Sequence, residues 1–362
     1  MGVLLIFEFF LVPAKPVEIP FHNVIYPYVE FRPPSLTTWV SDLPSPSSRT
    51  GELATTYTNQ DALRVESPDY HLTRRKPSGQ VRIAVLGGST VHIGTRFDVT
   101  LPGALKRVLH DRNPEVKIEV INGGIISAIS RQELIFLITT LIDYDLDMLV
   151  TYDGINDTGQ MLYYEKRPNF PYNYRVKEIA WDQYAAGKRD SIWEEVLSRS
   201  AAFNWLWPKK FGESKILDRV DPRTLINDQA NRRRYAEAHA DNWEKILRIC
   251  NAYKITPVFV LQPTSLYDHF SDELLAENQM TDSETYLYAN YLVYEEFRHT
   301  TQIFLNKHPE IIVSDMSSLL PETAFYDGAH VYDEINIQIA EKLADLLNGN
   351  LQRIIAKESQ GI

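Results

Sequence analysis

The chain has 362 residues, and 37 lysine and arginine against 48 aspartate and glutamate side chains give it a formal net charge of −11. This acidic balance argues against a nucleic-acid partner, because binding phosphates takes a basic surface. Hydrophobic residues make up 44% of the chain and charged residues 23%, which excludes a disordered, collagen-like or coiled-coil protein. Cys250 is the single cysteine, so no disulfide forms within the chain, and cysteine usage leaves the redox compartment open.

Residues 1–12 are apolar apart from Glu8, and Pro13 follows them. A spanning helix needs about 20 apolar residues, and a signal peptide needs a basic start and a small-residue cleavage site, so the stretch meets neither requirement. Two readings stay open. A buried strand or docking segment fits a cytoplasmic protein, whereas the end of a trimmed membrane anchor predicts an extracytoplasmic, membrane-tethered one.

Residues 13–80 are rich in proline, serine, threonine and tyrosine, and no amphipathic period is sustained there. This composition predicts an extended segment. Its aromatic side chains indicate packing onto a neighbouring domain: Phe21, Tyr26, Tyr28, Phe31 and Trp39. Residues 1–80 are therefore expected to form an N-terminal extended segment packed on the core.

Short apolar strands alternate with amphipathic helices from residue 81 onward. The expected strands are 81–86, 116–121, 148–152, 257–261 and 311–315. The expected helices are 101–111, 131–142, about 230–253, about 284–307 and about 334–348. This alternation predicts an α/β domain over residues 81–348, a flavodoxin-like three-layer α/β/α sandwich with a central five-stranded parallel sheet. Residues 349–362 are left as a C-terminal tail.

Residues 159–228 interrupt the alternation and hold four of the six tryptophans, which are Trp181, Trp193, Trp205 and Trp207. A connection of this length inside an α/β domain covers a site or carries a small subdomain of its own. The rings either form a private core of this aromatic-rich insertion or stack on a ligand, and stacking favours a sugar or an acyl chain.

Polar residues gather where the expected strands end, which is the edge at which parallel sheets bind ligands. Gly87-Gly-Ser-Thr90 follows the first strand, Asn122-Gly-Gly-Ile-Ile-Ser127 the second and Asp153-Gly-Ile-Asn-Asp157 the third. Asp327-Gly-Ala-His330 precedes the last helix. A hydroxyl, an imidazole, carboxylates and an amide are therefore expected to converge on one rim.

These residue types suit acyl transfer. A serine hydroxyl is a poor nucleophile unless a base takes its proton. His330 is the candidate base for Ser89, and Asp327, on the same loop, is the candidate that orients His330. Negative charge on the reacting carbonyl oxygen needs N–H donors, for which the backbone groups of Ser89 and Ser127 and the side-chain amide of Asn156 are candidates.

At these positions the sequence resembles the SGNH (GDSL) hydrolase superfamily, in its bacterial Gly-Gly-Ser-Thr variant, over roughly residues 81–348. The matching residues are Ser89 for the nucleophile, Gly154 and Asn156-Asp157 for the Gly-x-Asn-Asp block, and Asp327 and His330 for the Asp-x-x-His block. Residues 26–80 also look like the leader of such proteins. The resemblance implies an esterase, a lipase-like acylhydrolase or an acyltransferase, without metal or cofactor.

Two positions depart from the family pattern. Gly88 precedes the nucleophile where the family has aspartate, and Ser127 stands where the second block has its oxyanion glycine. The Ser127 N–H stays usable only if the backbone there accepts a Cβ, and Gly124 is the fallback donor. His92, one helical turn past Ser89, is a rival base.

The first expectation is a serine esterase that cleaves an acyl ester of a small molecule, carbohydrate or lipid through an acyl-enzyme. The same residues would serve an O-acyltransferase on a sugar or polysaccharide if the insertion excludes water. A binding protein of the same fold with weakened catalysis is a further reading, because losing one oxyanion donor lowers kcat by about 10²–10³.

Overall fold

The computed structural model describes residues 24–26, 30–32, 35–163, 168–171, 221–269 and 282–360. All of them belong to one of the two compact units into which the chain divides, Asn23–Tyr172 with Val220–Ile362. The apolar start at residues 1–12 and the four tryptophans of the insertion lie outside the described residues. None of the described helices is both long and apolar enough to cross a membrane.

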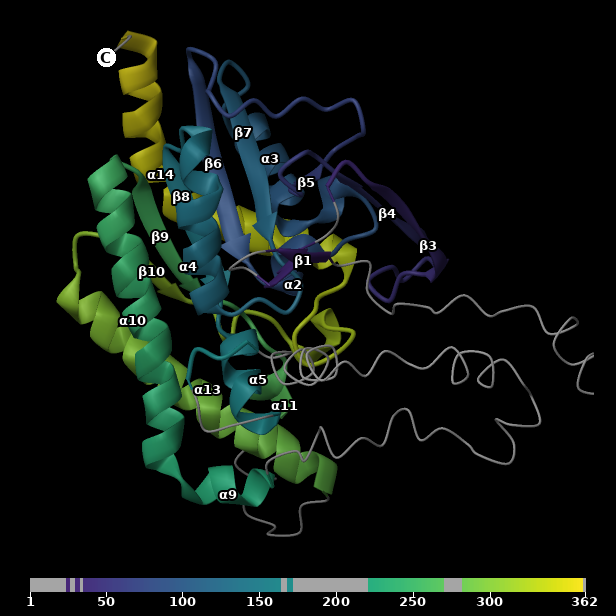
Figure 1. Ribbon diagram of the computed structural model, residues 1–362, viewed down its shortest axis with the longest axis vertical. Helices are drawn as coiled ribbons and strands as arrows, with labels where there is room; N and C mark the ends of the chain where they lie inside the picture. Colours follow the sequence, from purple (N-terminus) through teal and green to yellow (C-terminus); the bar gives the residue numbers. More distant parts are fainter. Residues whose placement is uncertain are drawn as a thin grey trace, which may run out of the picture. The chain divides into compact units, whose positions relative to one another are not determined.

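The core is a five-stranded parallel sheet with the lateral order β10-β9-β8-β6-β7 (Figure 1). Its strands are β6 (Gln80–Gly87), β7 (Lys117–Gly124), β8 (Met148–Asp153), β9 (Thr256–Leu261) and β10 (Ile312–Asp315). In chain order the second strand lies outside the first and the other three follow on the opposite side, which is the flavodoxin-like winding. The predicted fold class is confirmed, and each predicted strand is present.

Helices cover both faces of this sheet. The long ones are α3 (Leu101–Arg112), α4 (Ser130–Thr139), α10 (Gln229–Tyr253), α13 (Asp282–Lys307) and α14 (Asn336–Gln360). Ile83 and Val85 of β6 join the hydrophobic cluster that contains α3 and α14. Ala84 and Leu86 join the cluster that contains α4, α10 and α13. Because successive strand residues point to opposite faces, the apolar run of β6 supplies both clusters and produces three layers.

Shorter elements complete the described fold. They are α2 (Ser89–His92), α5 (Ile155–Tyr163), α9 (Pro222–Asn227), α11 (Leu266–His269) and the 3₁₀ turns η1 (Phe97–Val99), η2 (Leu141–Tyr144), η4 (Glu322–Ala324) and η5 (Asp333–Ile335). The expected insertion at 159–228 overlaps α5 at its start and α9 at its end, and most of it lies outside the described residues.

Two helix predictions need correction. The helix expected at 131–142 ends as α4 at Thr139, because Thr140 leaves the helical region with φ −142°, and η2 follows. The closing helix, expected to end near residue 348, continues to Gln360, so the described part of the expected tail is helical. Leu351 is buried in the same cluster as Leu347, which shows that the apolar face of α14 continues past Gly349.

The N-terminal segment adds strands to the sheet, which its sequence did not predict. β3 (Thr38–Pro44), β4 (Leu53–Thr58) and β5 (Arg64–Val65) continue the sheet beyond β7 in antiparallel fashion, seen as purple strands in Figure 1. The strands β1 (Val24–Tyr26) and β2 (Glu30–Arg32) pair separately. Through β3, β4 and β5, part of the leader therefore belongs to the same sheet as the core strands.

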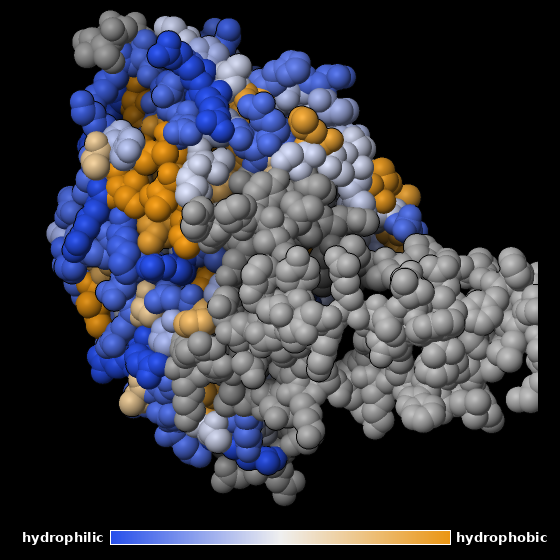
Figure 2. Space-filling model, in the orientation of Figure 1, coloured by the Kyte–Doolittle hydropathy of each residue, from blue (hydrophilic) through white to orange (hydrophobic). Residues whose placement is uncertain are grey.

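The visible face of the described residues is largely hydrophilic, in keeping with the net charge, with hydrophobic side chains exposed in places that include the β3–β4 edge (Figure 2). Val40 and Leu43 of β3 and Leu53 of β4 are exposed there. A register shift between Val40 and Pro44, and Pro44 itself, interrupt the ladder at this open edge. Both features discourage pairing with another strand.

Candidate active site

Ser89 begins α2 at the point where the central strand β6 ends. Gly87 pairs with β7 on one side and β8 on the other, and a Cβ at position 87 would overlap the Tyr152 carbonyl oxygen. This packing allows the chain to turn sharply from strand to helix. It leaves Ser89, with 8% of its surface exposed, at the carboxyl edge of the sheet.

His330 and Asp327 come from the loop before α14 and meet Ser89, 241 positions away in the chain. The His330 Nε2 atom lies 2.7 Å from the Ser89 Oγ atom. The His330 Nδ1 atom lies 2.8 Å from Asp327 Oδ2. The other oxygen, Asp327 Oδ1, accepts the backbone N–H groups of Ala329 at 2.8 Å and His330 at 2.7 Å. The three side chains that the sequence singled out therefore form one hydrogen-bonded series.

The Asp327 carboxyl is held in its ionised form. Burial acts to raise its pKa, but hydrogen bonds from the His330 ring and from the backbone of His330 and Ala329, with the charge of the ring, outweigh burial and lower the pKa. An ionised Asp327 accepts the Nδ1–H of His330, which leaves Nε2 free to accept the Ser89 hydroxyl proton. This is the tautomer that a general base needs.

Tyr326 stacks on the His330 ring, with ring centroids 5.6 Å apart and an angle of 13° between the planes. Sequence reasoning missed this contact. An aromatic residue directly before the Asp327 loop was the signal that could have found it. The stacked ring limits rotation of the imidazole.

The Asn156 amide lies beside the backbone that precedes Ser89. Its Nδ2 donates to the Ala128 carbonyl at 2.7 Å, and a Cβ at Gly88 would overlap Nδ2 and lie 3.5 Å from the Ala128 oxygen. The loops after β6, β7 and β8 therefore meet at Gly88. An amide nitrogen carries two protons, so Asn156 keeps one N–H for a further acceptor.

Ser127 adopts the left-handed conformation with φ +62°, the region that favours glycine. A serine is accommodated there at a cost of roughly 1 kcal/mol, and its N–H is retained. Among the described residues, neither the Ser127 N–H nor the Ser89 N–H has a hydrogen-bond acceptor. Both donors are therefore free to bind a substrate oxygen.

The fallback donor does not serve. The Gly124 N–H already donates to Asn122 Oδ1 at 3.0 Å within β7, so it has no proton to offer to a substrate. The expectation for Gly124 is wrong because the neighbouring asparagine side chain occupies the N–H.

His92 does not act as the rival base. Its ring is buried, its Nδ1 lies 3.1 Å from the Gly124 carbonyl oxygen, and burial together with the positive charge of Arg64 lowers its pKa to about 3. His92 is therefore neutral and joins α2 to β7. Its role is in packing.

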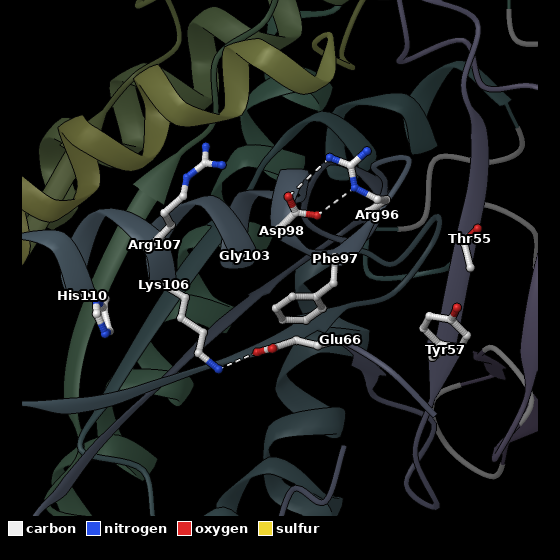
Figure 3. A pocket seen from close by; sticks show the side chains of 10 residues that line it. All are labelled: Thr55, Tyr57, Glu66, Arg96, Phe97, Asp98, Gly103, Lys106, Arg107 and His110. Carbon is white, nitrogen blue, oxygen red and sulfur yellow. Dashed lines mark hydrogen bonds and ion pairs between the residues drawn. The ribbon is translucent and has the colours of Figure 1, made fainter. Parts of the chain in front are cut away.

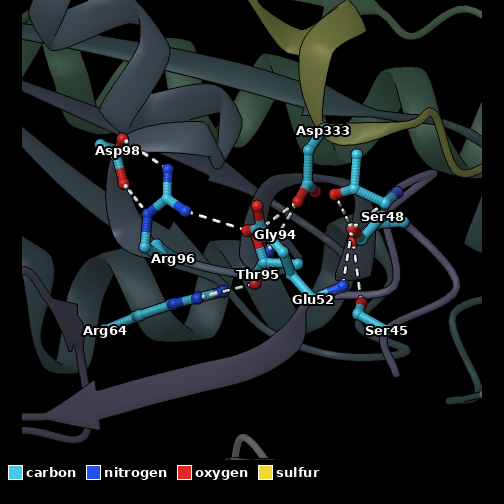
Figure 4. A network of polar contacts seen from close by, with 11 residues as sticks. Ser45, Ser48, Glu52, Arg64, Gly94, Thr95, Arg96, Asp98 and Asp333 are labelled. Atoms are coloured by element: carbon cyan, nitrogen blue, oxygen red, sulfur yellow. Dashed lines mark hydrogen bonds and ion pairs between the residues drawn. The ribbon is translucent and has the colours of Figure 1, made fainter. Parts of the chain in front are cut away.

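The segment that follows α2 is joined by polar contacts to Asp333 of η5 and to the N-terminal segment (Figure 4). Asp333 Oδ2 accepts the Thr95 backbone N–H at 3.1 Å and the Thr95 hydroxyl at 2.6 Å. The buried Arg64 of β5 donates to the carbonyl oxygens of His92 and Gly94. The leader therefore supports the segment that follows the nucleophile.

A separate hollow of about 520 Å³ lies between β4 and α3 (Figure 3). Two of its cations pair with acids that line it, Lys106 with Glu66 at 2.5 Å and Arg96 with Asp98 at 3.2 Å. It contains no member of the Ser89 site. Among the described residues no group of three or more His, Cys, Asp or Glu side chains is arranged to hold a metal ion.

No protein-family model and no curated protein sequence matches the chain. Solved structures resemble it at low identity. A gut microbial diltiazem-metabolizing enzyme is 13% identical with a TM-score of 0.43 over 77% of this chain, which spans 49% of that enzyme. A GDSL-like lipase from Parabacteroides merdae is 13% identical with a TM-score of 0.44, covering 75% of this chain and 98% of the lipase.

An acetylxylan esterase from Geobacillus stearothermophilus is 11% identical with a TM-score of 0.41, covering 75% of this chain and 96% of the esterase. At these TM-scores the similarities do not identify an activity. The function is therefore argued from the geometry around Ser89.

Proposed function

We propose that this protein is a serine esterase of the SGNH type that cleaves acyl esters through an acyl-enzyme. The single observation that carries the proposal is the series Ser89 Oγ, His330 Nε2, His330 Nδ1 and Asp327 Oδ2, with steps of 2.7 and 2.8 Å. A serine, a base and an orienting carboxylate in hydrogen-bonding sequence are the requirement for an activated hydroxyl nucleophile.

In the proposed mechanism the Ser89 oxygen attacks the ester carbonyl carbon while its proton moves to His330 Nε2. Asp327 stabilises the resulting imidazolium, and the alcohol leaves with the proton from His330. Water then attacks the acyl-enzyme while His330 takes its proton; the carboxylic acid is released, and His330 returns the proton to the Ser89 oxygen. The N–H groups of Ser89, Ser127 and Asn156 are the proposed donors to the oxyanion in both steps.

The departure at Ser127 does not favour a protein with weakened catalysis. The left-handed backbone at φ +62° keeps a free N–H on the same loop whose Ala128 carbonyl accepts the Asn156 amide. We therefore favour the hypothesis of an active esterase over that of a binding protein with the same fold. Acyl groups on carbohydrates or lipids are the proposed substrates, and transfer to a sugar hydroxyl instead of water is an outcome that the assay distinguishes.

The test combines a fluorophosphonate probe with a panel of p-nitrophenyl esters from acetate to palmitate and with acetylated sugars. Wild-type protein is expected to be labelled and to turn over at least one ester, and Ser89→Ala is expected to lose both. Chelators are expected to leave the rate unchanged. A folded wild-type protein that is neither labelled nor active on any ester would contradict the proposal, and acyl transfer to an added sugar in preference to water would favour the acyltransferase.

A further inference from the structure

Two of the three proposed oxyanion donors, Ser127 and Asn156, lie in the loop after β7 and at the start of α5, and two neighbouring residues of α5 connect these segments. Asn156, after β8, binds the Ala128 carbonyl at 2.7 Å on the loop after β7. The next residue, Asp157, accepts the Ser130 backbone N–H at 2.9 Å and the Ser130 hydroxyl at 2.6 Å. Asn156 and Asp157, in the first turn of α5, are thus joined to Ala128 in the loop after β7 and to Ser130 at the start of α4.

The direction of the Ser130 hydrogen bond is fixed from a third element. Asn242 of α10 donates its side-chain N–H to Ser130 Oγ at 2.9 Å. Because that oxygen accepts from Asn242, its own proton points at Asp157. Asp157 therefore accepts one hydrogen bond from an N–H and one from an O–H, although only 6% of its surface is exposed.

The surroundings of Asp157 make a carboxylate costly there. Asp153 lies in the same buried group and pairs with His239 at 2.7 Å and with the Trp243 indole N–H at 3.1 Å. Burial above all, and the Asp153 charge, raise the pKa of Asp157 to about 6, against the opposing effects of the His239 charge and the Ser130 hydrogen bonds. Burying a carboxylate costs free energy, so Asp157 is hard to explain by stability alone. A role in positioning the residues that it binds explains it better.

We propose that Asp157 is a positioning residue that holds the first turn of α5, with Asn156, against the Ser127–Ala128 loop, so that the N–H groups of Asn156 and Ser127 face one point beside Ser89. This inference rests on the proposed function and adds to it a residue that touches neither Ser89 nor His330. Its contribution is to the relative position of two donors. It therefore predicts a loss in turnover that depends on the presence of Asn156.

The experiment is a double-mutant cycle with Asp157→Ala and Asn156→Ala on the best ester of the panel. Asp157→Ala is expected to lower kcat by about 10–10²-fold in the wild-type background with KM changed less than about twofold. In the Asn156→Ala background it is expected to lower kcat by less than about threefold. Asp157→Asn keeps an acceptor for the Ser130 N–H and is expected to recover part of the loss.

Equal losses in the two backgrounds would mean that Asp157 only supports the fold, and this result would overturn the inference. The matched control is Asp143→Ala, a half-exposed aspartate on η2 that pairs with Arg74 at the surface, with no expected change in kcat. If Asp157→Ala does not fold, Ser130→Ala keeps the backbone N–H contact with Asp157 and removes the hydroxyl with its contacts to Asp157 and Asn242, and its loss of kcat is expected to shrink in the same way.

A second measurement keeps the inference independent of the substrate. Hydrogen–deuterium exchange of segments 125–130 and 154–158 is expected to quicken in folded Asp157→Ala and to stay unchanged in Asp143→Ala. Unchanged exchange in Asp157→Ala would overturn the inference while leaving the esterase proposal intact. A wild-type protein without Ser89-dependent labelling or turnover would instead remove the proposed function.

Discussion

At the scale of single residues, the site depends on the lack of a side chain at position 88. Gly88 departs from the family pattern, and the structure gives a physical reason for glycine in this chain. The space that a Cβ would fill at position 88 is occupied by the Asn156 amide nitrogen. The small residue therefore lets a proposed oxyanion donor lie directly beside the nucleophile turn.

Gly88→Ala is expected to lower kcat by about 10–10³-fold while changing the melting temperature little. The Cβ meets the far end of a side chain, which moves at small cost, but the amide then leaves the place where the oxyanion forms. Steady-state kinetics and thermal melts check this. Gly328→Ala is the control, because position 328, on the Asp327–His330 loop, has open space around it. Full activity in Gly88→Ala would mean that Asn156 is not an oxyanion donor.

At the scale of elements, α10 and α13 are joined at one end by a compact charged group. Glu244 of α10 accepts from Lys307, the last residue of α13, at 2.9 Å and pairs with His308 at 2.9 Å. The hydrogen bond from Lys307 is the largest cause of a lowered pKa at Glu244, and the hydrogen bond with His308 adds to it. Together they outweigh burial and bring the pKa to about 2. This group ties together two helices that cover the same face of the sheet.

Glu244→Gln is expected to lower the free energy of unfolding by about 1–2 kcal/mol at pH 7, a range reduced for solvent screening of the exposed Lys307. A lowered folded-state pKa contributes stability above the unfolded value near 4.5, and this is lost as the pH falls towards 2. The difference between wild type and variant in urea unfolding should therefore shrink between pH 5 and pH 2. The control is Glu237→Gln, which breaks the exposed ion pair between Glu237 and Arg233 on the same helix. Its free energy of unfolding should differ little from that of the wild type at any pH.

At the scale of the whole molecule, the leader and the parallel sheet form one structure. Arg64 lies in β5 between the leader strands and β7, and its guanidinium is bound by three carbonyl oxygens, those of Thr55, His92 and Gly94. Burial lowers its pKa to about 10, with Asp333 and Asp98 acting in the opposite direction. One buried cation thus links the leader to the loop after Ser89.

Arg64→Met is expected to lower the free energy of unfolding by about 2–4 kcal/mol, because two buried carbonyl oxygens, those of His92 and Gly94, and the partly buried one of Thr55 lose their donor. A fall in kcat should accompany it, since the segment after α2 loses its support. Chemical denaturation and ester turnover measure the two effects. Arg107→Met on α3 removes an exposed arginine and is expected to change the unfolding free energy by no more than about 0.5 kcal/mol. Equal stability of the two variants would contradict this role for Arg64.

The amino-acid sequence by itself determined the parallel sheet and its order of elements, because strand and helix periods and turn glycines are local signals. It also singled out Ser89, Asp327 and His330, since each stands at the end or start of a recognisable element. Tertiary structure alone decided that the Asn156 amide fills the space at Gly88 and that Arg64 supports the loop after Ser89. These contacts join residues from different elements, and no local period in the chain records which of them will meet.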